Sequence, residues 1–378
     1  MTRRDFVKSA VMAGAAIGMA GTYIRAQDSS IGSFQSLKYL ERRWDSTGRK
    51  LAFSAKTKEE WQVWRQETVG KLKELTGYVT MQKSPLNPKI TEEVDCGDYV
   101  RQRVELQTEP EVIMPVYVLI PKNTKPPYPP VVNPHGHGSG GKYSPAGRRD
   151  IPAIAKAIKQ YNYDYGVQYA RAGFISFCPD ARGFGERQED IVKKQGNILT
   201  QSCLYINQMA YPLGQTVTGM WTWDLHRLLD YVETREDCRK GKIGCAGLSG
   251  GGLQTLWASA LDERIGCAVI SGYMYGYKES LLDMHGNCSC NYVPHLWENV
   301  DMGDIGALIA PRPVLVETGT RDPLNGASGL ANVKSQIEII RNAFRLLSAE
   351  DKVKHDIFEG EHLWHGVEAI PWMKKWIV

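Results

Sequence analysis

A glycine-rich turn between a buried strand and a helix constrains this chain more than any other part of its sequence. The segment from Ile243 to Gly252 reads IGCAGLSGGG, in which Gly247 and Gly251 flank Ser249 in the pattern Gly-x-Ser-x-Gly. Such a turn holds the serine in a strained backbone conformation, and glycine two residues to either side avoids a collision. The hydroxyl is lifted out of the sheet toward the amides that open the next helix. The pattern predicts a nucleophilic serine, and the alternative is a turn that only packs the helix against the strand.

The first 26 residues look like an export signal and not like part of the fold. The pair Arg3 and Arg4 precedes an apolar, small-residue run from Ser9 to Gly21, as in twin-arginine signal peptides. The run is shorter than the roughly twenty apolar residues of a membrane span. We expect cleavage after Ala26, with Ala20 as the alternative, and a periplasmic or extracellular protein delivered by the twin-arginine machinery. A buried N-terminal helix is the other interpretation.

Removal of this signal changes the charge balance of the 378-residue chain. The formal net charge is +4, but four basic side chains and one acidic side chain precede Gln27, so the mature part keeps +1. We therefore expect no nucleic-acid partner, and no later segment is apolar enough to span a membrane. About 350 residues are enough to bury a large core.

All eight cysteines lie in the mature part. Three of them, Cys178, Cys245 and Cys267, fall in apolar, strand-like runs and are expected to be buried thiols. Pairing among the other five cannot be deduced from the sequence; these are Cys96, Cys203, Cys238, Cys288 and Cys290.

The order of helix and strand patterns predicts an α/β fold. An amphipathic helix over residues 57–76 ends at Gly77 and belongs to a helical extension over residues 27–88. From residue 89 onward a meander of strands (90–94, 99–106 and 112–120) gives way to alternating helices and strands. This alternation predicts a catalytic domain over residues 89–378, with a mostly parallel central sheet and helices on both faces.

An acid and a histidine follow the serine along the chain. Asp322 comes just after a predicted strand and would orient and stabilise the histidine, although Asp-Pro also suits a simple turn. Glu317 is the competing acid, but it falls within that strand. His362 follows the last predicted strand and would take the proton of Ser249 as general base. His365 is the second candidate and fits a supporting role or a substrate contact better.

Two backbone amides are expected to bind the negative charge that develops on the substrate oxygen. One belongs to Gly250, directly after the serine, and the other to His137 in the run His135-Gly136-His137-Gly138. The two histidines of that run could instead suggest a metal. Histidines this close on a loop at a strand end seldom share one ion, so we expect none there.

A second run also carries metal-ligand types. His285-x-x-Cys288-x-Cys290, with His295 downstream, contains residues that suit zinc, but Cys-x-Cys is not the usual zinc-finger spacing. A structural loop, with or without a disulfide to a distant cysteine, is the preferred interpretation. We therefore expect neither a metal nor a cofactor.

Taken together, these segments resemble the acetyl xylan esterase and dienelactone hydrolase branch of the α/β hydrolases, from about residue 89 to the C-terminus. The resemblance implies the α/β-hydrolase fold and a Ser249, Asp322 and His362 triad, and it does not specify a substrate. Dienelactone hydrolases proper use cysteine where this chain has serine, and the known deacetylases carry glutamine where it has Gly250. The matching segments are His135–Gly138, Asp180–Glu186, Gly247–Gly251, Gly319–Pro323 and Gly360–His362.

Aromatic side chains near the predicted site suit a sugar ligand. Tyr273, Tyr275 and Tyr277 follow a predicted strand, and Trp297 and Trp364 lie in nearby loops. Aromatic faces stack on sugar rings, but they are equally ordinary packing residues. The side chains expected to contact substrate are Tyr273, Tyr275, Trp364, His365 and Arg182.

These observations predict an exported serine carboxylesterase that acts on carbohydrate esters, as an acetyl xylan esterase does. One alternative is a methyl esterase on uronates, for which Lys142, Arg148 and Arg149 could bind a carboxylate; they could also form a solvated basic surface. Another alternative is a catalytically silent glycan-binding protein of the same fold. A peptidase fits less well, because the chain has no extra domain of propeller size.

Overall fold

The computed structural model describes residues 35–284 and 286–378. The predicted export signal, residues 1–26, lies outside the described residues. The chain divides into two units, one that ends at Arg43 and one that spans Trp44–Val378. Helix α2 (Ser36–Ser46) begins in the first unit, and all other elements belong to the second.

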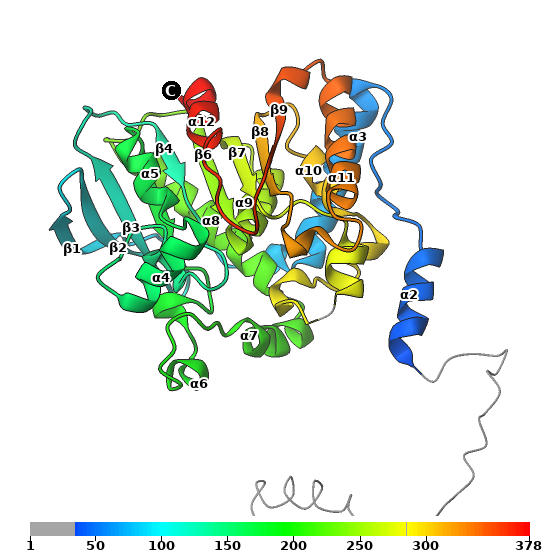
Figure 1. Cartoon of the computed structure of the whole chain (residues 1–378), viewed down its shortest axis with the longest axis horizontal. Helices are drawn as coiled ribbons and strands as arrows, with labels where there is room; N and C mark the ends of the chain where they lie inside the picture. The colour runs from blue at the N-terminus through cyan, green and yellow to red at the C-terminus, as the bar shows by residue number, and fades with distance from the viewer. Residues whose placement is uncertain (1–34, 285) are drawn as a thin grey trace, which may run out of the picture. The chain divides into compact units, whose positions relative to one another are not determined.

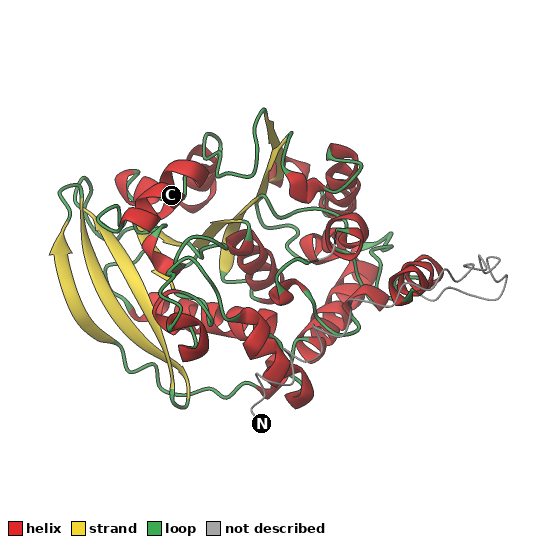
Figure 2. Cartoon of the chain, turned by 60° about the horizontal axis from the view of Figure 1, so that its bottom comes forward, coloured by secondary structure: helices red, strands yellow, loops and turns green. Residues whose placement is uncertain are grey.

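A nine-stranded sheet forms the centre of the second unit, in the order β1-β2-β3-β5-β4-β6-β7-β8-β9 (Figure 1). The first three strands pair antiparallel and form one edge of the sheet (Figure 2). β3 is antiparallel to β5, and the strands from β5 to β9 in this order are parallel. The predicted meander and mostly parallel sheet are confirmed. The strands are β1 (Lys89–Asp95), β2 (Tyr99–Glu109), β3 (Val112–Pro121), β4 (Pro130–Val132), β5 (Ile175–Pro179), β6 (Ile243–Leu248), β7 (Ile265–Ser271), β8 (Val314–Gly319) and β9 (Val353–Phe358).

Helices cover both faces of this sheet, as the alternation of elements predicts. α4, α5 and α12 pack on one face, and α8, α9, α10 and α11 pack on the other. β7 serves both layers, because Cys267 and Val269 face the first and Ala268 and Ile270 face the second. The helices are α3 (Lys58–Leu75), α4 (Pro152–Tyr161), α5 (Tyr165–Arg171), α6 (Asp190–Lys193), α7 (Cys203–Ala210), α8 (Val217–Thr234), α9 (Gly250–Leu261), α10 (Met302–Ala307), α11 (Leu330–Leu346) and α12 (Ala369–Ile377).

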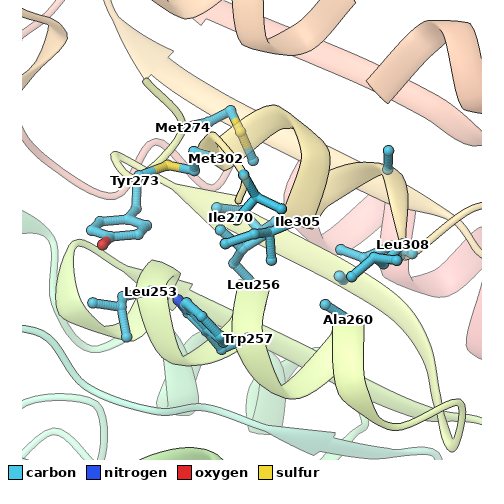
Figure 3. Close-up of a cluster of buried hydrophobic side chains, with 14 of the residues drawn as sticks. Leu253, Leu256, Trp257, Ala260, Ile270, Tyr273, Met274, Met302, Ile305 and Leu308 are labelled. Atoms are coloured by element: carbon cyan, nitrogen blue, oxygen red, sulfur yellow. The ribbon is translucent and has the colours of Figure 1, made fainter. Parts of the chain in front are cut away.

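The largest apolar core lies between α9 and its neighbours. Figure 3 shows side chains of α9, β7 and α10 in this core, where Leu256 of α9 lies beside Ile270 of β7 and Ile305 of α10, and Trp257 of α9 belongs to the same cluster. Because all four side chains are almost completely buried, α9 and therefore its N-terminus are held firmly against the sheet.

Helix α3 closely matches the predicted helix over residues 57–76. The Thr57 hydroxyl caps it by accepting the amide of Glu60 at 3.1 Å, and Gly77 follows it with φ +72°. Trp64 and Leu72 of α3 are part of the same core as α9. The predicted division at residue 88 therefore falls inside one packed unit. No helix among the described residues has both the length and the hydropathy to cross a bilayer.

The topology brings several loops to one edge of the sheet. β4 lies between β5 and β6, so the loops after β4 and β6 leave the sheet side by side. The carboxyl ends of β7, β8 and β9 point to the same edge, because these strands are parallel to β6. Such an edge is where α/β proteins place their sites.

Candidate active site

Ser249 occupies a strained turn between β6 and α9. Its φ and ψ are 61° and −120°, a conformation that side-chain-bearing residues rarely adopt. A Cβ on Gly247 would lie 2.6 Å from the carbonyl oxygen of Gly251, and one on Gly251 would lie 2.2 Å from that of Pro134. The predicted need for glycine on both sides of the serine is confirmed.

Asp322 and His362 form a hydrogen-bonded pair. Asp322 follows β8, where its Oδ1 accepts the amide of Leu324 at 2.9 Å, and its Oδ2 lies 2.7 Å from His362 Nδ1. The carboxylate is 2% exposed and the imidazole 19% exposed. Because the carboxylate accepts a hydrogen bond from Nδ1–H, the other ring nitrogen, Nε2, remains for proton exchange.

Ser249 and His362 line one cavity of about 500 Å³. Four tyrosines and three side chains with amide groups are among the residues that line it. Among the residues that the structure describes, no lysine or arginine lines this cavity. The lining residues are His137, Gly138, Tyr161, Tyr163, Gln201, Ser249, Gly250, Tyr273, Tyr275, Gly286, Asn287, Cys288, Asn291, Pro323, Leu324 and His362.

The loop after β4 is fixed through its carbonyl oxygens. Four successive carbonyls accept hydrogen bonds from side chains, so the loop cannot rotate its peptide planes freely. Within the described chain, the amides of His137 and Gly250 have no acceptor. These amides are therefore available to a ligand, as expected for oxyanion donors. The four bonds are Tyr165 Oη to Pro134 O at 2.6 Å, Gln254 Nε2 to His135 O at 2.8 Å, Ser139 Oγ to Gly136 O at 2.7 Å and Tyr163 Oη to His137 O at 2.8 Å.

The two histidines of this loop differ in their surroundings. His135 is buried, and its Nε2 accepts the amide of Ala181 at 3.1 Å. Burial lowers the pKa of His135 to about 4, so the ring is neutral at pH 7. His137 lines the cavity instead, with its ring edge-to-face against Phe184 at 5.2 Å between centroids.

The His137 ring also accounts for glycine after the serine. A Cβ at Gly250 would lie 2.9 Å from His137 Nδ1 and 3.1 Å from its Cε1. The imidazole thus occupies the space that a side chain at position 250 would need. Gly250, which stands where the known deacetylases carry glutamine, therefore leaves room for the His137 ring.

Of the five expected substrate contacts, Tyr273 and Tyr275 line the cavity. Trp364 does not, because it is fully buried and packs 4.8 Å from the ring of Tyr165. The prediction for Trp364 is therefore wrong. Tyr277 and Trp297 pack against each other at 6.3 Å and are likewise absent from the lining among the described residues.

His365 and Arg182 are also engaged elsewhere. His365 Nδ1 lies 2.7 Å from Asp356 Oδ2, and its ring stacks on that of Phe358. His365 is not among the described residues that line the cavity. Arg182 donates to Asp224 at 2.9 and 3.0 Å and to Glu109 at 2.6 Å. These bonds hold the guanidinium within the protein, and Arg182, like His365, is not among the described residues that line the cavity.

The competing acid Glu317 lies apart from His362. Its Oε1 accepts the amide of Gly366 at 2.9 Å, and burial raises its pKa to about 7. Because Asp322 is the carboxylate that contacts the His362 ring, Glu317 has no direct part in this pair.

The loop that carries Lys142, Arg148 and Arg149 contributes no cation to the described lining of the cavity. Lys142 is wholly buried, where its Nζ donates to Asp180 at 2.6 Å, so it forms neither a solvated surface nor a substrate contact. Arg148 and Arg149 pair with Asp150 and Asp164, respectively. A uronate-binding role for these residues finds no support in their positions.

Several cavity residues escaped the sequence analysis. Tyr161 is the last residue of α4 and Tyr163 follows it, Gln201 and Asn287 come from irregular segments, and Asn291 ends a short helix at Ser289–Asn291. The irregular segments have no hydrophobic periodicity that would reveal their positions. The segment around Asn291 reaches the cavity beside Tyr273, whose hydroxyl donates to Asn291 Oδ1 at 2.8 Å.

Comparisons with known proteins agree with this architecture. A model of the Abhydrolase family matches residues 40–358. A relative, “Putative hydrolase YtaP” of Bacillus subtilis (strain 168), is 28% identical over 274 residues, which cover 70% of this chain and 83% of that protein.

Two solved structures share the fold at low sequence identity. A “putative acetyl xylan esterase” from Bacteroides fragilis NCTC 9343 has a TM-score of 0.74 at 17% identity, covering 91% of this chain and 95% of that one. A glucuronoyl esterase from Solibacter usitatus has a TM-score of 0.62 at 15% identity, covering 87% and 97%. With the family model spanning most of its length, the chain belongs to the Abhydrolase family of α/β hydrolases.

Proposed function

We propose that this protein is an exported serine carboxylesterase that removes acyl groups, such as acetyl, from carbohydrates. The observation that carries the proposal is the geometry around one cavity. Ser249 on a strained turn, His362 bonded to Asp322 at 2.7 Å, and two amides without acceptors in the described chain all border the same space. These are the parts that acyl transfer by a serine needs.

In the proposed reaction the hydroxyl of Ser249 attacks the ester carbonyl while His362 Nε2 takes its proton. The amides of His137 and Gly250 stabilise the oxyanion. The alkoxide of the sugar leaves with the proton from His362, which leaves an acyl-serine. Water then attacks the acyl group, again with His362 as base, and the carboxylic acid is released.

The cavity lining supports a neutral sugar ester. Tyrosine rings and hydroxyls, together with the amides of Gln201, Asn287 and Asn291, suit the faces and hydroxyls of a sugar. A pectin-like chain carries free carboxylates, for which a cationic partner is favourable. Since no such side chain is found in the described lining, we favour acetylated neutral glycans over methylated uronates. The names of the two solved structures support an ester on a carbohydrate.

Incubation with acetylated xylan and with methylated pectin, followed by assays for acetate and methanol, tests this proposal. We expect acetate and little methanol. Ser249→Ala is expected to lower kcat on a small activated acetate by about 10⁵-fold or more, whereas Ser335→Ala, at an exposed serine of α11, leaves it unchanged. Activity that survives in Ser249→Ala contradicts the mechanism. Glycan binding without hydrolysis by the parent protein would indicate the silent glycan-binding alternative.

Export is proposed from the paired arginines of the N-terminal segment. Replacement of Arg3 and Arg4 by lysine is expected to keep the protein inside an expressing bacterium that has the twin-arginine machinery. Fractionation of periplasm and cytoplasm measures this, and export that continues in the double variant contradicts the assignment.

A further inference from the structure

Four potential metal ligands meet at the wall of the cavity. The side chains of His137, Cys203, Cys288 and Cys290 each offer one ligand atom, and these atoms all lie within 4.8 Å of one another. Cys290 Sγ lies 3.4 Å from His137 Nε2. The four residues come from three segments far apart in sequence: the loop after β4, the first turn of α7, and the turn before and within the short helix at Ser289–Asn291.

Three thiolates and one imidazole are a donor set that selects zinc. Structural zinc sites are tetrahedral, with bonds of about 2.3 Å to sulfur and about 2.0–2.1 Å to nitrogen, so neighbouring ligand atoms are separated by about 3.6–3.8 Å. The 3.4 Å between Cys290 Sγ and His137 Nε2 lies just below that range, and no separation exceeds 4.8 Å, so closure onto one ion needs shifts of about 1 Å at most. All three cysteines are free thiols, so none is withdrawn from the set by a disulfide.

We propose that His137, Cys203, Cys288 and Cys290 bind one zinc ion. The thiols release their protons on binding, and the imidazole coordinates through Nε2 as a neutral ligand. Because four protein ligands fill a tetrahedral site, no position remains for substrate or water. The ion would therefore be structural, and the triad mechanism proposed above proceeds without it.

Neighbouring side chains form hydrogen bonds to the cysteine segments of this cluster. Asn291 Nδ2 donates to the Cys288 carbonyl at 3.0 Å and approaches Cys290 Sγ at 3.8 Å. Thr218 Oγ1 donates to the carbonyl of Cys290 at 2.5 Å. Such bonds to ligand backbones and sulfurs orient the ligands before the metal arrives.

The site also has a route of entry. Cys203 and Cys290 are fully buried, but His137 and Cys288 line the cavity and are only half-buried. An ion entering from the cavity would meet these two residues first. Of the two histidines in the sequence pattern, His295 is exposed, lies near Glu298 and is not part of the cluster, whereas His285 lies outside the described residues.

Zinc here would tie three segments of the cavity wall together. In addition, it would hold the ring of His137, whose amide is a proposed oxyanion donor; this consequence rests on the proposed function. The metal content itself does not depend on it. A Ser249→Ala protein is expected to be inactive and yet to retain zinc, so failure of one proposal is distinguishable from failure of the other.

The experiment measures metal in the full mature chain by mass spectrometry of the elements, after growth with added zinc and exhaustive dialysis. We expect about one zinc per chain in the parent. Cys203→Ser and Cys290→Ser are expected to retain less than about a tenth of that amount. Cys96→Ser is the matched control, because Cys96 lies outside the cluster, and it is expected to retain zinc fully.

A second measurement covers the case in which the serine variants fail to fold. Cobalt added to the metal-free parent is expected to give thiolate charge-transfer and tetrahedral ligand-field bands that zinc then abolishes. Removal of the metal by a chelator is expected to lower the melting temperature. The proposal is overturned if the parent binds neither ion, or if its intact mass and thiol titration show the cluster cysteines joined in a disulfide.

Discussion

The imidazole ring of His137 fills the space beside Gly250, at 2.9 Å from the position of a Cβ there. The residue after the serine and a residue of the preceding loop, more than a hundred positions earlier in the chain, are therefore matched in size. The backbone amides of both residues are proposed to bind the oxyanion. A larger side chain at either position is therefore expected to displace both amides.

Gly250→Ala is expected to lower kcat by about 10-fold or more with a smaller effect on KM. The new methyl group pushes the His137 ring and with it the His137 amide, and loss of one oxyanion donor costs about 10²–10³ in kcat. Gly70→Ala is the control, because nothing lies within 4 Å of a Cβ at that exposed helical glycine. It should be neutral for activity and stabilise slightly, since alanine favours a helix. Unchanged kcat in Gly250→Ala would argue against the paired donors.

Asp322→Asn is expected to lower kcat by about 10⁴-fold, because an amide cannot hold the His362 tautomer that accepts the serine proton. The chain contains a matched pair for comparison. Asp356 and His365 are bonded with the same 2.7 Å distance but lie outside the cavity lining. Asp356→Asn should therefore change kcat by less than about 3-fold. Equal losses in the two variants would mean that Asp322 acts only through folding.

Tyr165→Phe tests whether the fixed carbonyls of the loop matter. The hydroxyl of Tyr165 donates to Pro134 O at 2.6 Å, deep in the protein, and its loss leaves a buried carbonyl unsatisfied at a cost of about 1–3 kcal/mol. We expect lower kcat with KM nearly unchanged. Tyr169→Phe is matched to it, because this buried hydroxyl on the same helix has no partner among the described residues. Urea unfolding and acetate release distinguish the two, and parallel behaviour would contradict the role of the hydrogen bond.

Glu317→Gln is expected to alter how stability depends on pH. Burial raises the pKa of Glu317 to about 7, from 4.5 in an exposed glutamate. The folded state thus holds the proton more tightly than the unfolded state. The stabilisation is present below about pH 4.5 and is lost as the pH rises through about 7. The rise in the pKa of Glu317 from 4.5 to about 7 corresponds to about 3 kcal/mol in the free energy of unfolding, at 1.36 kcal/mol per pKa unit.

Glutamine cannot ionise, and it can still accept the amide of Gly366. Glu317→Gln should therefore be more stable than the parent at pH 8, with little difference at pH 5. Denaturant unfolding at both values measures this, with Glu338→Gln, at an exposed position of α11, as control. A variant that is less stable than the parent at pH 8 contradicts the raised pKa.

The sequence predicts those parts of the site that depend on short-range rules. The turn around Ser249 follows from glycine spacing between a strand and a helix, and Asp322 and His362 follow from their positions after strands. The positions of Trp364 and His365 could not be predicted, because closeness to His362 along an irregular segment does not tell which way a side chain points. In the structure one enters the core and the other turns to Asp356.

The cavity residues outside the proposed triad and oxyanion loop could not be predicted either, because their positions depend on contacts between distant segments. Gln201 and Asn287 lie in irregular segments whose courses depend on long-range packing, and Tyr161 is the last residue of α4, where its sequence position does not show that it reaches the cavity. The cysteine cluster shows the same limit. The spacing of Cys288 and Cys290 and the histidines of the run at 135–138 each suggest metal ligands separately, but nothing local links the two runs to each other or to Cys203. Only the three-dimensional arrangement brings these four residues together.

The backbone of Ser249 has a consequence for any effort to make this protein more heat-resistant. Glycine adopts φ 61° and ψ −120° without the strain of about 1–3 kcal/mol that a side chain incurs there. A library screened only for survival at high temperature is therefore expected to enrich Ser249→Gly, a more stable protein that lacks the proposed nucleophile. Directed evolution of this enzyme should score turnover and melting temperature together.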